Sequence, residues 1–166
     1  MKKIIGVLLS VLLMLTFAAC AQPDDGQITV GICQIEPHPA LDAATKGFMD
    51  VLTAQFGEEN IEFIVQNAAG DSNTLNTIIN DFVAKEVDLI LANSTPVLQT
   101  AAAATTTIPI LGTSVTEYSV ALDLDDFNGT VGRNISGTSD LAPLTEQADM
   151  ILEWFPEAKN VGLLYC

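Results

Sequence analysis

The feature that most constrains the fold is a regular alternation of short apolar runs with amphipathic stretches. The apolar runs are rich in β-branched residues, and such runs predict strands that are covered on both faces. Between them, apolar residues recur at the spacing of a helix. Strands that are separated by single helices imply right-handed crossovers and a parallel sheet. The predicted strands span residues 28–35, 61–67, 87–93 and 108–114.

A predicted helix follows each of the first three strands. Pro39 suits the first turn of the helix at 39–52. The next helix has the clearest apolar stripe, which begins at Leu75, and Asp71 or Ser72 is its expected N-cap. An alanine-rich stretch at 96–105 is the third helix. We therefore predict an α/β fold with a doubly wound parallel sheet.

Beyond residue 114 the pattern is less regular. Periodicity fades between 115 and 133, where aspartate, asparagine and glycine indicate a loop. An extended stretch at 134–140, a helix at 143–155 and a buried strand at 160–166 are expected to follow. Because a buried strand needs neighbours on both sides, we expect the chain to be a truncated form of a longer protein.

The first twenty residues have the three regions of a secretory signal. Lys2 and Lys3 precede an uncharged apolar run, and two alanines stand directly before Cys20. This ending resembles a bacterial lipobox, in which the cysteine is lipidated. We predict a lipoprotein signal peptide over 1–19, an acylated Cys20 that anchors the protein to a membrane, and a polar tether over 20–27. A cleaved signal without lipidation is the alternative.

The chain is strongly acidic, with a formal net charge of −15 at pH 7. This charge excludes nucleic acid as a partner, because binding phosphates requires a basic surface. Three cysteines do not make a disulfide framework, and Cys33 is predicted to be a small core residue. No cofactor is predicted, and the lone His38 is a poor metal site.

Several segments of the mature chain share a resemblance to one family. The segments are VGICQIEPHPALDAATKGF, QNAAGDSNT, DLILANSTPVLQTAA, IPILGTSVT, NISGTSDL and EWFPEAKNVGLLY. Together they resemble the ABC substrate-binding family that includes tryptophan and tyrosine importers. The resemblance implies a periplasmic-binding-protein-like (type I) lobe with a hinge segment over 28–138, and the start of a second lobe over 139–166.

The same resemblance implies a function and a location. It implies the extracytoplasmic, substrate-binding component of an ABC importer, which captures a small solute in a cleft between two lobes. An amino acid, and an aromatic one in particular, is the expected solute, and an ABC permease is the expected partner.

Polar residues at the carboxyl ends of the strands are the site candidates, because ligands of open parallel sheets bind beyond those ends. They are Gln34, Glu36 and His38 after the first strand, Asn67 after the second, Ser94 and Thr95 after the third, Ser114 and Thr116 after the fourth, and Ser139 and Asp140 in the hinge stretch.

A zwitterionic amino acid would fit these candidates. Ser94 and Thr95 stand at a helix start, which attracts a carboxylate, and Asp140 could pair with an ammonium group. Helix capping is the alternative role for each of these residues, and an exposed loop position is the alternative for His38. Apolar walls of the site are expected in the second lobe.

The sequence also bears on two other classes of function. An enzyme is not expected, because the sequence has no G-x-S-x-G, Walker loop, Cys-x-x-Cys or second histidine. A ligand-sensing lipoprotein module that signals to a membrane partner is the alternative to import, and the fold does not distinguish the two. With most of one lobe missing, the chain alone is expected to bind ligand weakly or not at all.

Overall fold

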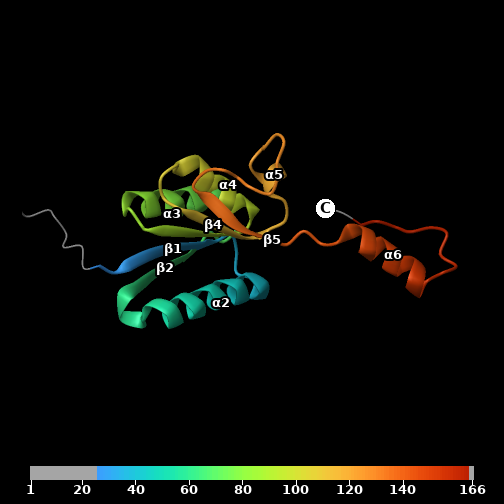
Figure 1. The fold of residues 1–166 in the computed structure, drawn as a ribbon, viewed down its shortest axis with the longest axis horizontal. Helices are drawn as coiled ribbons and strands as arrows, with labels where there is room; N and C mark the ends of the chain where they lie inside the picture. The colour runs from blue at the N-terminus through green and yellow to red at the C-terminus, as the bar shows by residue number, and fades with distance from the viewer. Residues whose placement is uncertain (1–25, 165–166) are drawn as a thin grey trace, which may run out of the picture.

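A single five-stranded parallel sheet organises the structure (Figure 1). The computed structural model describes residues 26–164. The strand order is β2-β1-β3-β4-β5, and every neighbouring pair is parallel. This doubly wound order confirms the predicted fold class. The strands are β1 (Ile28–Gln34), β2 (Ile61–Asn67), β3 (Leu89–Asn93), β4 (Ile110–Val115) and β5 (Ile135–Ser139).

The predicted signal peptide, Cys20 and most of the tether lie outside the described residues. Within residues 26–164, no helix has the length and apolar character that crossing a bilayer requires.

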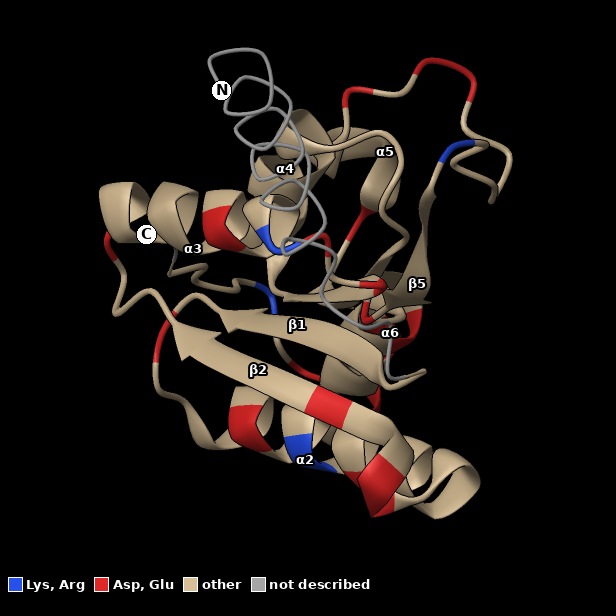
Figure 2. Cartoon of the chain, turned by 90° about the vertical axis from the view of Figure 1, so that its left-hand side faces the viewer, with Lys and Arg blue, Asp and Glu red and all other residues tan. Residues whose placement is uncertain are grey.

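Helices cover both faces of the sheet, as Figures 1 and 2 show. On one face lies α2 (Pro39–Phe56), whose Phe48, Met49 and Leu52 pack on a cluster that includes Val30 and Ile32. On the other face lie α3 (Ser72–Ala84) and α4 (Thr95–Ala104), which contribute to the larger core cluster. A single turn of 3-10 helix, η2 (Glu58–Asn60), leads into β2.

The predicted stripe of α3 forms the centre of the larger cluster. Leu75, Ile78, Ile79 and Phe82 are all buried. Gly31 on β1 makes this possible, because a Cβ at that position would lie 2.7 Å from the Phe82 ring. Removing the side chain from the strand therefore lets the helix approach the sheet.

The helix starts follow local rules. Asp71 is the N-cap of α3, as predicted, and its Oδ1 accepts a hydrogen bond of 2.7 Å from the Thr74 backbone N–H. That bond stabilises the charged carboxylate and so lowers the pKa of Asp71. Pro39 lies in the first turn of α2, also as predicted.

One helix was missed in the stretch that was predicted to be a loop. The short α5 (Tyr118–Ala121) begins after Glu117, whose side chain accepts hydrogen bonds from the Ser119 N–H and hydroxyl. Tyr118 and Ala121 are buried against the larger core cluster. Four residues are too few to show a helical period, so only the cap could have indicated this helix.

The C-terminal prediction was partly wrong. The expected helix is present as α6 (Leu144–Trp154), but residues 158–164 form no strand. Leu163 and Leu164 are 86% and 99% exposed. The physical reason is that no described strand lies beside this segment to supply hydrogen bonds and cover its side chains. Figure 1 shows α6 standing apart from the sheet.

Candidate ligand-binding site

Polar residues form one row across four neighbouring strands, at or near the carboxyl end of each strand. Asn67, Gln34 and Asn93 are register partners across β2, β1 and β3, and Thr113 on β4 continues the row beside Asn93. Register partners in a parallel sheet point their side chains to the same face. Leu89 and Leu91, at the alternate positions before Asn93, belong to the α2 side of the core. The row therefore lies on the face that α2 covers.

The centre of this row is the point where the order of the sheet reverses. From β1 the chain runs outward to β2 on one side, and from β3 it runs outward through β4 to β5 on the other. The helices that follow β1 and β3 therefore lie on opposite faces, which leaves a crevice at the carboxyl ends of these two strands. Gln34 and Asn93 end the two strands at that crevice.

A buried hydrogen-bond chain connects these two residues to α2. Gln34 Nε2 donates to Asp42 Oδ1 at 2.9 Å, and the Thr45 hydroxyl donates to Gln34 Oε1 at 2.5 Å. Asn93 Nδ2 donates to Thr45 Oγ1 at 3.0 Å and to the Leu41 carbonyl at 2.8 Å. Gln34, Thr45 and Asn93 are all buried. Both ends of the Gln34 amide therefore bond to α2, which fixes the start of that helix on the sheet.

Two polar atoms at the end of β3 have no partner. Asn93 Oδ1 and Ser94 Oγ are buried and make no hydrogen bond. Leaving such an atom unsatisfied costs on the order of 1–3 kcal/mol, so each unsatisfied group asks for an explanation. Polar groups that a ligand supplies when it binds would satisfy these atoms.

Ser94 is unusual in two further ways. It is the N-cap of α4, yet its side chain makes no capping hydrogen bond. Its φ of 134° is a conformation that residues with side chains rarely adopt. The first turn of α4 contains Pro96, and its N–H groups have no partner within the helix. Strain, a free hydroxyl and a helix start thus coincide at one residue, which is the pattern expected of a binding position.

The other residues predicted after β1 and β2 bond locally. His38 is the exposed N-cap of α2, and its Nδ1 accepts a hydrogen bond of 3.1 Å from the Ala40 N–H. Glu36 is exposed beside it. Asn67 Oδ1 accepts from the Ala69 N–H at 2.8 Å, which turns the chain after β2. These residues shape the rim of the strand ends, and Glu36 presents a charge there.

The residues predicted after β4 and β5 form a second group. The Ser139 hydroxyl donates to the Thr116 carbonyl at 2.6 Å and accepts from the Leu141 N–H at 3.2 Å. The Asp140 N–H donates to the Val115 carbonyl, which ties the hinge stretch to β4. Ser114 has a φ of 55° and is half-buried. Asp140 itself is exposed, so its carboxylate is accessible to a ligand.

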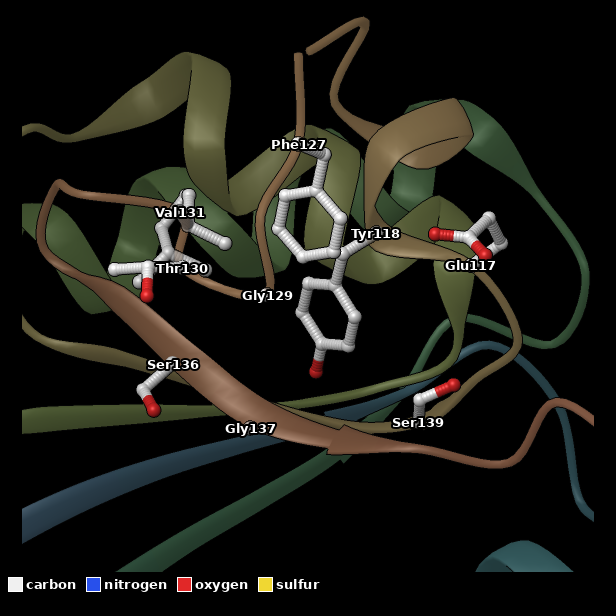
Figure 3. A pocket seen from close by; sticks show the side chains of 10 residues that line it. Glu117, Tyr118, Phe127, Gly129, Thr130, Val131, Ser136, Gly137 and Ser139 are labelled. Carbon is white, nitrogen blue, oxygen red and sulfur yellow. The ribbon is translucent and has the colours of Figure 1, made fainter.

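A cavity of about 410 Å³ lies beside β5, on the face opposite α2 (Figure 3). Its wall includes Tyr118, Phe127 and Ser139, and Figure 3 shows both aromatic rings turned toward β5. Tyr118 Oη fits against Gly112 and Gly137, where a Cβ on either glycine would overlap it. Burial, with the Asp140 carboxylate second, raises the pKa of this tyrosine. Of the predicted residues, only Ser139 lines the cavity.

The structure therefore brings the candidates into groups along one edge of the sheet. Gln34 and Asn67 share the polar row, Ser94 and Thr95 start α4, and Ser139 contacts Thr116.

Sequence reasoning missed Thr45 and Asn93. The period of two along β3 could have indicated Asn93, because it places this polar residue in phase with two apolar ones. Thr45 gave no such signal, since a threonine on a helix is unremarkable.

Acidic residues outnumber basic ones in this chain, 21 to 6. Figure 2 shows acidic residues over several elements and few basic ones. Lys46 and Lys85 form exposed ion pairs with Asp50 and Asp81, one helical turn away.

No group of three or more His, Cys, Asp or Glu that could hold a metal occurs among residues 26–164. Burial raises the pKa of Cys33 to about 12, so its thiol stays protonated and inert.

Comparison with known proteins decides the family. The profile of the ABC transporter substrate binding protein family matches residues 29–166. The chain belongs to this family. A relative called tyrosine-binding protein, from Clostridioides difficile strain R20291, is 34% identical over 180 residues, which cover 99% of this chain and 52% of the relative.

Solved structures of similar proteins agree with the fold. The ligand-free, open structure of a substrate-binding protein with adhesive properties from Clostridium difficile has a TM-score of 0.72 at 38% identity, over 80% of this chain and 45% of that one. An ABC domain in complex with L-Trp, from Streptococcus pneumonia, has a TM-score of 0.71 at 28% identity, over 78% and 44%. The chain of this ABC substrate-binding family member thus spans about half the length of its relatives.

Proposed function

We propose that this chain is the first lobe, with the start of the second, of a binding protein that captures an amino acid for an ABC importer. The observation that carries the proposal is Ser94, whose buried and unpartnered hydroxyl stands at the start of α4. Membership of the family supports a binding role over an enzymatic one and favours import over signalling. The relatives named for tyrosine and L-Trp support an aromatic amino acid as the ligand.

The ligand would lie at the carboxyl edge of the sheet, in a cleft between this lobe and a second one. Its carboxylate would bind the Ser94 hydroxyl and the N–H groups of the first turn of α4, where the helix dipole favours negative charge. The exposed Asp140 carboxylate, and the neighbouring Ser139 and Ser114, would face the same cleft from the hinge side. Thr95 and Thr116 would add hydroxyls at its rim.

The apolar face of α6 supports the two-lobe part of the proposal. Leu144, Leu152 and Phe155 are about 60% exposed, at 64%, 59% and 63%. An exposed apolar patch of this kind marks a surface that another unit covers. In the proposal, the second lobe begins after β5, so that Ser139 stays with the sheet, and the rest of that lobe covers this face. Closure of two lobes on the ligand would then present both to the permease.

The location of the protein is part of the proposal. The signal-like residues 1–19 and Cys20 support export and a lipid anchor, with the domain outside the cytoplasm and held at the membrane by acyl chains. The excess of acidic residues supports attachment through that anchor rather than through contact with anionic lipid.

A thermal-shift screen of the full-length product of the gene against the twenty amino acids tests this function. A ligand that binds only the folded state raises the melting temperature. We expect a shift with tyrosine, tryptophan or phenylalanine, and little or none for the 166-residue chain alone. A cooperative melt with no shift for any amino acid would contradict the proposal.

The Ser94→Ala variant sharpens this test. Because Ser94 Oγ makes no hydrogen bond, removing it should leave the melting temperature without ligand unchanged or slightly higher. Binding of the amino acid should weaken about tenfold, the value of one hydrogen bond to a charged group. Ser72→Ala, at the exposed start of α3, is the matched control and should leave binding unchanged. Unchanged binding by Ser94→Ala would remove Ser94 from the site.

A further inference from the structure

The hydrogen-bond chain between α2 and the sheet has a fixed direction. At one end, the Asp42 carboxylate can only accept, so the NH₂ group of Gln34 must face it. The Oε1 atom of Gln34 then faces Thr45, so the Thr45 hydroxyl must donate to it. With its proton used, the Thr45 oxygen can only accept from the next group along the chain.

The direction set at Asp42 reaches Asn93. The NH₂ group of Asn93 donates to Thr45 Oγ1 and also to the Leu41 carbonyl, which is a second group that can only accept. Turning the Asn93 amide over would place two acceptors against its oxygen. The amide is therefore held in one orientation, and Asn93 Oδ1 lies on the side away from these two partners without a hydrogen bond.

We propose that Thr45 is a positioning residue for ligand recognition, because it holds Asn93 so that Oδ1 accepts a hydrogen bond from the ammonium group of the ligand. Asn93 is fully buried, so the ammonium reaches Oδ1 either through one bridging water or after a local rearrangement at the end of β3. Either route requires the same acceptor. This inference rests on the proposed function, and it assigns the ammonium end of the ligand a partner at the switch point of the sheet.

The position of Asn93 fits this role. It ends β3 at the crevice between β1 and β3, and the next residue is Ser94, at the start of α4. An acceptor next to a group of donors is complementary to a zwitterion, whose ammonium and carboxylate are joined through one carbon. Thr45 is buried on α2 against the ends of β1 and β3, and it acts on the ligand only through Asn93 and Gln34.

The test compares amino acids with analogues that lack the ammonium group. Calorimetry on the full-length gene product would measure L-tyrosine against 3-(4-hydroxyphenyl)propionate, and L-tryptophan against 3-indolepropionate. In Thr45→Val, which has nearly the same shape and no hydroxyl, we expect the affinity for the amino acid to fall about tenfold. The affinity for the analogue should change less than about twofold, because the analogue makes no bond to Oδ1. Thr45→Ser keeps the hydroxyl and should behave as the unmodified protein.

A milder variant covers the case in which Thr45→Val does not fold. Asp42→Asn, at an exposed position, replaces the carboxylate that fixes the direction of the hydrogen-bond chain with a neutral amide. This change should lower the affinity for the amino acid about threefold and leave the affinity for the analogue unchanged. Asp50→Asn on the same helix removes the same charge outside the chain of hydrogen bonds, and should change neither affinity.

The outcomes separate this inference from the proposed function. An equal loss for the amino acid and the analogue, or no loss for either, would overturn the role of Thr45 and leave the proposed function standing. Failure of the unmodified protein to bind tyrosine or tryptophan would overturn the proposed function, and this inference with it. A loss that is selective for the amino acid, and absent in Thr45→Ser, is the result we expect.

Discussion

The helices α3 and α6 have similar amphipathic sequences and opposite surroundings. Both carry apolar residues at helical spacing, but the stripe of α3 is buried against the sheet, whereas no residue of α6 is buried. This difference shows that a periodic pattern is enough to predict a helix, whereas burial of its apolar side chains depends on whether a partner surface is present. In this chain the sheet supplies that surface for α3, and nothing among the described residues supplies it for α6.

The comparison extends to the regions that contain these helices. Residues 28–139 form five paired strands with an apolar core on each face. Residues 140–164 add one helix, and the large apolar side chains there are exposed. The first region should therefore determine the stability of the chain, and the second should contribute little to it.

A pair of core-size changes should separate the two regions most clearly. Phe82→Ala in α3 removes a fully buried ring and should lower the free energy of unfolding by about 3–5 kcal/mol. Leu152→Ala in α6 should change it by less than about 0.5 kcal/mol, because the side chain is 59% exposed. Urea unfolding followed by circular dichroism measures both. A cost for Leu152→Ala of more than about 1 kcal/mol would show that α6 packs on the first region.

A pair of glycine changes should give a smaller difference. In Gly137→Ala the new methyl group would overlap Tyr118 Oη and the Gly112 carbonyl, so we expect a loss of about 1–3 kcal/mol. In Gly162→Ala the new methyl group meets nothing within 4 Å, so stability should not change. Melting temperatures of the two variants provide the comparison. Equal melting temperatures would mean that β5 moves away from Tyr118 at little cost.

The smallest effect concerns pH and the thiol of Cys33. Burial raises the pKa of this thiol from 9.0 to about 12 in the folded chain. The contribution of the buried thiol to stability is therefore complete below pH 9, and the free energy of unfolding should fall by about 1.4 kcal/mol per pH unit between pH 9 and 12, where only the unfolded chain loses the proton. Urea unfolding at pH 8 and pH 10 should show that the stability difference between the unmodified chain and Cys33→Ala shrinks by about 1.4 kcal/mol. A difference that is independent of pH would place Cys33 in contact with solvent.

Much of the fold could be predicted because its signals are local. The strand runs at 61–67 and the stripe from Leu75 each lie within one element, and the cap at Asp71 lies within one turn. The strand at 160–166 was also predicted from a local signal, because its residues favour a strand. The prediction was wrong because a strand also needs neighbouring strands that are distant in sequence. The family could be predicted for a similar reason, because its segments occur in one order along the chain.

The sequence by itself determined most of the elements and their order, because propensity, periodicity and crossover handedness act over short stretches. It also predicted the edge of the sheet at which we propose that the ligand binds. Only the tertiary structure decided which polar residues at that edge are satisfied within the protein and which are free. Gln34 and Asn93 both end strands with polar side chains, but Gln34 is fully bonded, whereas Asn93 keeps one oxygen without a partner. That distinction depends on where α2 places Thr45, and such a contact between distant segments leaves no pattern in the sequence.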